Sequence, residues 1–139
     1  MDFEPYLFFS GNCEEALSFY KGIFGGEISG VMRWKDAPSE QGTPPTDGNK
    51  IMHSTFQSPS IKFMAADGRS TTQYGEGRIS LSLGTTDVAE AKRVFESLGK
   101  GGKVEMPMEK TFWGAMFGML TDKYGIDWMV NCQLEPLPV

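Results

Sequence analysis

Apolar and polar residues alternate in short runs along much of the chain, and this pattern predicts strands. The clearest case is an apolar run at 115–120, a polar turn at 121–125, and then apolar residues at every second position from Ile126. In that last segment the apolar residues Ile126, Trp128 and Val130 alternate with Asp127, Met129 and Asn131. A period of two predicts a strand with two different faces, so we expect a hairpin here.

Helical spacing of apolar residues appears twice, and each time an acidic residue follows a capping residue by three positions. Asn12 with Glu15 precedes the first stripe, and Asp87 with Glu90 precedes the second. Such pairs satisfy the free backbone N–H groups at a helix start. We therefore predict two helices with these buried stripes: Ala16, Leu17, Tyr20, Ile23 and Phe24 in the first, and Ala91, Val94, Phe95 and Leu98 in the second.

The remaining apolar runs complete a repeated order of elements. Each half of the chain reads strand, helix, strand, strand, strand, with predicted strands at 3–9, 27–35, 50–57 and 61–66, and at 78–83, 103–108, 115–120 and 126–131. We predict a single α+β domain over 1–139, built from βαβββ modules at 1–67 and 78–134, with a cupped mixed sheet and flanking helices. A unit that cannot cover its own sheet is expected to pack against another, from the same chain or a second one.

One long segment between predicted strands has one small apolar residue, Ala37, apart from its prolines. Residues 36–49 contain three prolines and two glycines, so they cannot bury much surface. We expect a mobile exposed loop, which is either a solvent-exposed connection without a function or a lid over a site.

Composition excludes several classes of protein. The 139 residues carry a formal net charge of −5 without a cluster of Lys and Arg, which argues against nucleic-acid binding. No apolar run approaches the ~20 residues needed to span a membrane, and the first residues do not resemble a signal peptide. We expect a cytoplasmic protein. Cys13 and Cys132 could form a disulfide, but two packed thiols are favoured in a reducing compartment.

Four segments together resemble one protein family. They are PYLFFSGNCEEALSFY at 5–20, KIMH at 50–53, TFW at 111–113 and FGMLTDKYGIDWMVN at 117–131. On these motifs the chain resembles the vicinal oxygen chelate superfamily, which includes glyoxalase, bleomycin-resistance proteins and extradiol dioxygenases. The resemblance is greatest to its PhnB-like branch, often labelled 3-demethylubiquinone methyltransferase-like. It implies paired βαβββ modules around a cup. No glycine-rich loop after a strand suggests an S-adenosylmethionine site.

The resemblance also implies where a family metal would be held, and the residues there are unsuited to it. The expected ligand positions fall at Pro5, Arg78, Met64 and Met129. Proline cannot coordinate, arginine repels a cation, and a thioether is a poor ligand for hard divalent metals. The chain has one histidine, His53, so a site with two histidines cannot form within it. We expect no metal and no other cofactor.

The cup is instead expected to be lined by apolar and aromatic side chains with a few polar ones. His53 is either a strand histidine bonded to its surroundings or a polar group in the cup that acts near neutral pH. Each lining residue could equally belong to a filled core. The candidate ligand-binding residues are Leu7, Phe9, Trp34, His53, Phe56, Met64, Arg78, Ser80, Ser82, Trp113, Phe117, Asp127 and Met129.

Two functions of different kinds follow. The first is a metal-free protein that encloses a small apolar or aromatic molecule, as bleomycin-resistance relatives do, in a homodimer. The alternative is a lyase, isomerase or dioxygenase whose metal is held in a rearranged site by His53 and carboxylates such as Glu4, Glu76 or Asp127. A fold kept for protein interaction is a third possibility. Catalytic residues are not identified by the sequence.

Overall fold

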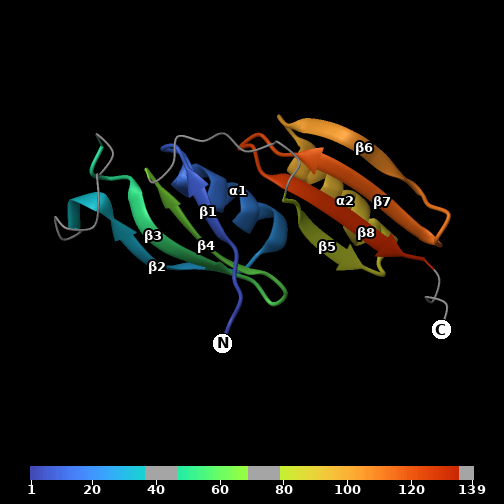
Figure 1. Cartoon of the computed structure of the whole chain (residues 1–139), viewed down its shortest axis with the longest axis horizontal. Helices are drawn as coiled ribbons and strands as arrows, with labels where there is room; N and C mark the ends of the chain where they lie inside the picture. Colours follow the sequence, from blue (N-terminus) through green and yellow to red (C-terminus); the bar gives the residue numbers. More distant parts are fainter. Residues whose placement is uncertain (37–46, 69–78, 135–139) are drawn as a thin grey trace. The chain divides into compact units, whose positions relative to one another are not determined.

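A computed structural model of the chain describes residues 1–36, 47–68 and 79–134. The chain forms two compact units, Met1–Thr72 and Gln73–Val139 (Figure 1). Each unit is described by itself. Most of the loop predicted at 36–49 and the candidate residue Arg78 lie outside the described residues.

The first unit has one four-stranded mixed sheet and one α-helix among its described residues. The strand order is β1-β4-β3-β2, with β1 parallel to β4 and the other neighbours antiparallel. Its elements are β1 (Tyr6–Phe9), α1 (Cys13–Phe24), β2 (Glu27–Arg33), the short 3-10 helix η1 (Trp34–Asp36), β3 (Ile51–Gln57) and β4 (Lys62–Asp67).

The second unit repeats this arrangement. Its four-stranded sheet has the order β5-β8-β7-β6, and β5 is parallel to β8 as β1 is to β4. The elements are β5 (Leu81–Thr85), α2 (Val88–Gly99), β6 (Lys103–Lys110), β7 (Ala115–Thr121) and β8 (Asp127–Gln133). The predicted α+β fold of two βαβββ modules is confirmed, with a separate sheet in each module.

Two predicted strands begin later than expected. The strand predicted from residue 3 begins at Tyr6, and the one predicted from residue 78 begins at Leu81. The first paired positions are Tyr6 opposite Met64 and Leu81 opposite Trp128.

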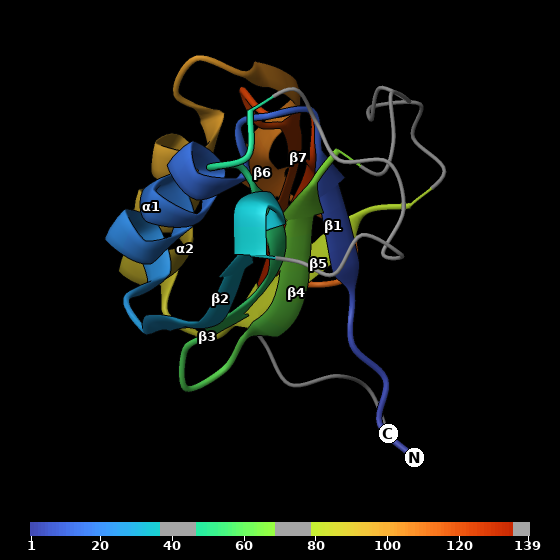
Figure 2. The ribbon, with the colours of Figure 1, turned by 90° about the vertical axis from the view of Figure 1, so that its left-hand side faces the viewer.

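In the first unit, α1 packs against one face of the sheet, and no helix of the described residues covers the opposite face (Figure 2). Tyr20 of α1 meets Phe63 of β4 edge-on, with ring centroids 5.9 Å apart. Phe63 in turn stacks on Phe56 of β3 at 5.0 Å. These three side chains are fully or almost fully buried and form the centre of the core beneath α1.

In the second unit, α2 packs so closely on β7 that one strand position must be glycine. A Cβ on Gly118 would lie 2.6 Å from Cε2 of Phe95 in α2 and 2.9 Å from the sulfur of Met108. Gly118 is opposite Val130 of β8, and that buried side chain therefore shares the face that α2 covers. This contact explains the glycine within the apolar run at 115–120.

Candidate functional site

The face of the first sheet opposite α1 carries the chain's single histidine among apolar and aromatic side chains. Strand register defines this face, because directly paired residues point to the same side. Met64 of β4 pairs with Tyr6 of β1 and with Thr55 of β3. His53 is two residues from Thr55 and pairs with Met32 of β2. We call this surface the open face of the first unit: Tyr6, Phe8, Met32, His53, Thr55 and Met64.

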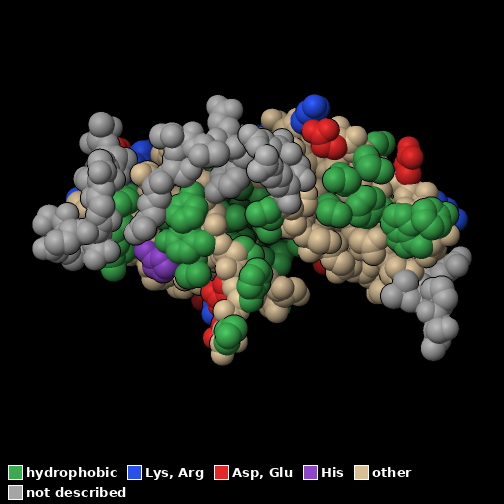
Figure 3. Space-filling view, viewed as in Figure 1, with side chains coloured by type: hydrophobic (Ala, Val, Ile, Leu, Met, Phe, Trp, Pro, Cys, Tyr) green, Lys and Arg blue, Asp and Glu red, His purple; other side chains and the backbone are tan. Residues whose placement is uncertain are grey.

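A side-chain hydrogen bond links two strands across this open face. The Tyr6 hydroxyl lies 2.9 Å from Nδ1 of His53. The Tyr6 ring also stacks on Phe8, with centroids 4.8 Å apart and an interplanar angle of 19°. Tyr6, Phe8, His53 and Met64 are all half-buried, so their edges remain available to solvent. Figure 3 shows the histidine beside a group of hydrophobic side chains.

Charged residues lie at one end of this face. Lys62 Nζ lies 3.0 Å from Oε1 of Glu4, and Lys62 is two residues from Met64 on the same strand. Glu27 of β2 is exposed on the same side, because it pairs with Gln57, which pairs with Lys62. The open face combines one imidazole, one phenol and the Thr55 hydroxyl with apolar surface, and its charged end is more acidic than basic, a composition suited to an uncharged or aromatic small molecule.

Three residues predicted to line the cup lie on the other side of the sheet, and for them the predicted orientation is wrong. Leu7 pairs with Ala65, which is one position from Met64 and so faces α1, while Phe9 pairs with Asp67 on that same face. Phe56 pairs with Phe63 beneath the helix. All three predicted residues are buried in the core, Phe56 completely.

The internal repeat contained the signal that would have corrected this error. Tyr6 is opposite Met64, and Ser82 is opposite Met129. Tyr6 and Ser82 are therefore equivalent, and since Ser82 is predicted to line the cup, Leu7, one residue from Tyr6, is expected on the helix side. The run at 6–9 is apolar throughout, so its own sequence gives no alternation to read. Tyr6 and Phe8 were missed for this reason, and Thr55 and Met32, which lie on other strands, were also missed.

The second unit also has a face opposite its helix, and most residues predicted for it lie there. Met129 pairs with Ser82 and with Met119, and Phe117 pairs with Asn131, all on the side away from Gly118 and α2. Trp113 precedes β7 and meets Phe117 at 6.0 Å, while 43% of Trp113 is exposed. Asp127 accepts a hydrogen bond from Oγ1 of Thr121 at 2.6 Å.

The remaining predicted residues have other surroundings. Ser80 precedes β5 and is half-buried. Trp34 is buried in η1, and its Nε1–H donates to the backbone carbonyl of Asp67 at 3.1 Å. Trp34 therefore secures the end of β4. This hydrogen bond gives Trp34 a structural role that the sequence did not indicate.

The residues at the expected metal positions do not fit a divalent ion. Pro5 contributes its backbone carbonyl to Met64 N–H at 3.0 Å, and Met64 and Met129 offer only thioethers. Across 1–36, 47–68 and 79–134, no three His, Cys, Asp or Glu side chains form a group that could hold a metal. These donors are unsuited to the hard metals of the superfamily, so no chemical step is assigned to an ion.

Both cysteines are buried and present as free thiols. Burial, with the nearby Asp67 carboxylate, raises the pKa of the Cys13 thiol to about 12. A thiol that remains protonated at neutral pH is a poor nucleophile. Cys13 therefore serves as a packed side chain at the start of α1.

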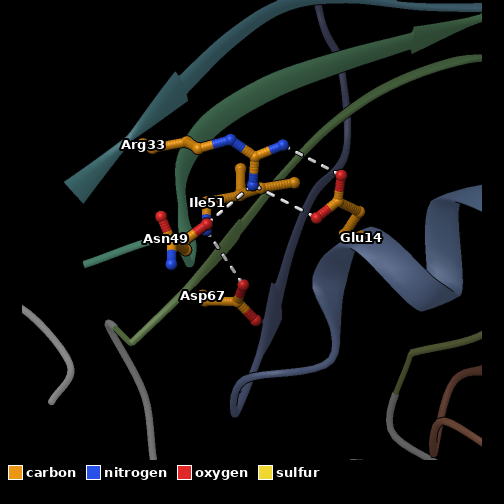
Figure 4. Close-up of polar contacts among 5 residues, drawn as sticks. All are labelled: Glu14, Arg33, Asn49, Ile51 and Asp67. Carbon is orange, nitrogen blue, oxygen red and sulfur yellow. Dashed lines mark hydrogen bonds and ion pairs between the residues drawn. The ribbon is translucent and has the colours of Figure 1, made fainter. Parts of the chain in front are cut away.

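A second polar region surrounds the start of α1, where the Asp67 carboxylate binds three backbone N–H groups, of which Figure 4 shows the one from Ile51. Its Oδ1 accepts from Gly11 and Cys13, each at 2.9 Å, and its Oδ2 accepts from Ile51 at 3.1 Å. Only 1% of Asp67 is exposed. Asn12, predicted to cap this helix with its own side chain, makes no such hydrogen bond, so that prediction is wrong.

A cavity of about 470 Å³ lies beside this helix start and is lined in part by Asn49, Lys50 and Asp67. Glu14, which also lines it, pairs with Arg33, whose Nη2 lies 2.9 Å from Oε2. The hydrogen bond from Arg33 lowers the pKa of Glu14. The side chains of Glu14, Arg33 and Asp67 thus connect β2, β3 and β4 to α1. Their role is structural.

The fold and the donor set together define a class of protein. Two βαβββ units, each with a helix on one face of a mixed sheet, are the architecture of the vicinal oxygen chelate superfamily, here with thioethers where metal-binding members have ligands. The family model described as 3-demethylubiquinone-9 3-methyltransferase matches residues 1–131. The chain belongs to this family, the PhnB-like branch of the superfamily.

Similar proteins extend over nearly the whole chain. Protein YjdN of Escherichia coli (strain K12) is 32% identical over 142 residues, which cover 94% of this chain and 95% of that protein. Protein PA1353 from Pseudomonas aeruginosa is 41% identical, with a TM-score of 0.82 and coverage of 96% and 98%. A Bacillus cereus protein titled putative 3-demethylubiquinone-9 3-methyltransferase, PhnB protein, is 28% identical, with a TM-score of 0.78 and coverage of 95% and 99%.

More distant structures share the fold alone. A glyoxylase/bleomycin resistance protein/dioxygenase domain from Frankia sp. EAN1pec is 15% identical, with a TM-score of 0.65 and coverage of 96% and 97%. Within the described residues, neither helix has the length and apolar character needed to cross a membrane.

Proposed function

We propose that this PhnB-like protein binds a small apolar or aromatic molecule without a metal, and that the open face of the first unit is the part of the binding site that supplies its polar contact. The observation that carries the proposal is the Tyr6–His53 hydrogen bond, at 2.9 Å, within an otherwise apolar surface. A fixed polar pair surrounded by aromatic and thioether groups is the usual composition of a small-molecule site.

The side chains around the pair support this function in different ways. Phe8 stacks on Tyr6 and extends its flat surface. Met64 lies beside Tyr6 through strand register, and an unbranched thioether adapts to ligands of different outline. In the second unit, Trp113 and Phe117 form a separate aromatic surface, with ring centroids 6.0 Å apart.

We also propose that the protein is a cytoplasmic homodimer. Strand β2 lies at one edge of the first sheet, where Val31 and Met32 are 44% and 43% exposed. Exposed apolar residues on an edge strand favour pairing with another chain. Mass measurement by light scattering at micromolar concentration tests the dimer, and a monomer mass would refute it.

A ligand screen tests the proposed site. Thermal unfolding of the full chain is followed with a panel of uncharged aromatic and aliphatic molecules, and compounds that raise the midpoint are titrated by calorimetry. We expect Met64→Lys to weaken binding of such compounds at least tenfold, because the charge occupies the open face. Val104→Lys in β6 is the matched control, since Val104 is 47% exposed and packs near Gly99 on the helix side of the other sheet.

Two outcomes would contradict the proposal. Equal losses in both lysine variants would show that the open face of the first unit is not the site. Elemental analysis of protein purified without chelator, then incubated with Zn, Ni, Mn or Fe(II), is the second test. One tightly held ion per chain would favour the metal-dependent enzyme instead, and His53 would be the first residue to replace.

A further inference from the structure

The imidazole of His53 has two nitrogens, and among the described residues one of them has a hydrogen-bond partner. Nδ1 is bonded to the Tyr6 hydroxyl at 2.9 Å. Within the part of the chain that the structure describes, His53 makes no other hydrogen bond. The ring is half-buried on the open face, so Nε2, like the hydroxyl of Thr55, is a polar atom there that a bound molecule can engage.

The Tyr6 contact determines what Nε2 can offer. A neutral imidazole has one N–H donor and one acceptor nitrogen. We assign the hydroxyl of Tyr6 as the donor to Nδ1, because a phenol O–H donates more strongly than an imidazole N–H. The proton of the ring then lies on Nε2. His53 thereby presents a donor to the open face, and Tyr6 holds that tautomer in place.

Charge on the open face limits the ligand further. Lys62 is paired with Glu4 at 3.0 Å, so it is not an available partner for an anionic ligand. The chain as a whole carries a formal net charge of −5, which repels anions at long range. An acceptor that needs no counter-charge is therefore favoured over a carboxylate.

Resting on the function proposed above, we propose that this site selects uncharged aromatic molecules that carry a carbonyl oxygen, with the Nε2–H of His53 as the donor to that oxygen. The aromatic part stacks against the flat surface formed by Tyr6 and Phe8, whose rings are 4.8 Å apart and inclined by 19°. The carbonyl then lies at the edge of the stack, where the imidazole is bonded to Tyr6.

Three probes of similar size separate the contributions of shape, acceptor and charge. They are 2-acetonaphthone, which has a neutral carbonyl, 2-ethylnaphthalene, which lacks an acceptor, and 2-naphthoate, which carries a charged one. Dissociation constants are measured with the full chain by equilibrium dialysis. We expect the ketone to bind about tenfold more tightly than the hydrocarbon, as one added hydrogen bond predicts, and more tightly than the carboxylate.

Variants assign the preference to the histidine. His53→Phe keeps an aromatic ring and removes the donor, so the ratio of ketone to hydrocarbon affinity should fall from about ten to about one. His53→Gln restores a side-chain N–H and should recover part of that advantage. Tyr6→Phe tests the positioning role, because freeing Nδ1 lets the tautomers exchange and should reduce the ratio without abolishing hydrocarbon binding. Unfolding midpoints confirm that each variant is folded.

Failure of this inference is distinguishable from failure of the proposed function. If none of the probes binds, and the wider screen also finds no ligand, both are overturned. If ketone and hydrocarbon bind equally, or if the ratio is unchanged in His53→Phe, only the acceptor preference is wrong. Tightest binding of the carboxylate would overturn the preference for an uncharged ligand.

Discussion

The two helices of this protein occupy equivalent places in a repeated fold, yet their first turns are stabilised in different ways. α2 is capped locally: Asp87 accepts from the N–H of Glu90 at 3.2 Å. α1 is capped by Asp67, which comes from β4 and accepts from Gly11 and Cys13, 56 and 54 residues away. A local cap stabilises one helix, whereas a remote cap ties the helix to its sheet.

The position that makes this difference can be identified from the repeat. Phe9 pairs with Asp67 at the end of β1, and Thr85 pairs with Cys132 at the end of β5. The second unit therefore has a buried thiol where the first has a buried carboxylate. Without that carboxylate, α2 depends on its own Asp87. Two units with the same topology can therefore stabilise their helices by different polar contacts.

The largest expected effect is that of removing the remote cap. Asp67→Ala leaves the buried N–H groups of Gly11, Cys13 and Ile51 without their acceptor, so we expect a loss of about 3 kcal/mol or more in the free energy of unfolding. Urea unfolding followed by circular dichroism measures it. Asp47→Ala, at an exposed aspartate, is the control. A loss below about 1 kcal/mol would show that Asp67 is not essential to the first unit.

The next effect arises at the first residue of α1 and appears only in alkaline solution. The pKa of the Cys13 thiol is raised to about 12 from an ordinary value of 9.0, so folding favours the protonated thiol. That stabilisation is present in full below pH 9 and is lost as the pH rises toward 12. By pH 10 the wild-type protein should lose about 1.4 kcal/mol more than Cys13→Ala does.

Urea unfolding of both proteins at pH 7 and pH 10 measures this difference. Groups that titrate in both proteins, such as lysines and tyrosines, cancel in the comparison. The equivalent position at the start of α2 is Val88, which has no titrating group. Parallel pH dependence in wild-type and Cys13→Ala protein would contradict the assigned burial of the thiol.

A smaller loss is expected at the local cap. Asp87→Ala removes the acceptor of Glu90 N–H, and replacing an N-cap aspartate by alanine typically costs about 1 kcal/mol. Asn12→Ala is the matched variant on α1 and should have almost no effect, because Asn12 makes no side-chain capping bond. Urea unfolding of the two variants ranks them. Equal losses would mean that the helices are capped alike after all.

The sequence predicts those features whose causes are local. Asp87 and Glu90 are three residues apart, and alternation in β8 correctly placed Asp127 and Met129 on one face. Sequence could not reveal Asp67 as a cap, because its partners become neighbours only when β1 and β4 pair.

The open face was predicted only in part for the same reason. His53 and Met64 were identified, but the uniformly apolar run in β1 left the choice between Tyr6 and Leu7 to strand register. The bond between Tyr6 and His53 joins residues 47 positions apart. It depends on the same β1–β4–β3 pairing that brings Asp67 to α1, so the cap and the candidate site share one structural cause.

The smallest expected effect concerns the acidic residue in the first turn of each helix. Glu14 of α1 pairs with Arg33 of β2, whereas Glu90 of α2 has the local partner Thr85. The pKa of Glu14 is lowered, first by the hydrogen bond from Arg33, so its stabilisation is present above the ordinary glutamate pKa and is lost as the pH falls through the lowered value.

Glu14→Gln should therefore reduce stability slightly at pH 7 and not at pH 3, and high salt should diminish the loss because the pair is exposed to solvent. Glu90→Gln is the matched control, whose partner is an uncharged hydroxyl, so a smaller salt dependence is expected. Urea unfolding at both pH values and at two salt concentrations measures these differences. If Glu14→Gln loses the same stability at pH 3 as at pH 7, the ion pair with Arg33 of β2 is not the cause. Glu14 would then support α1 through packing.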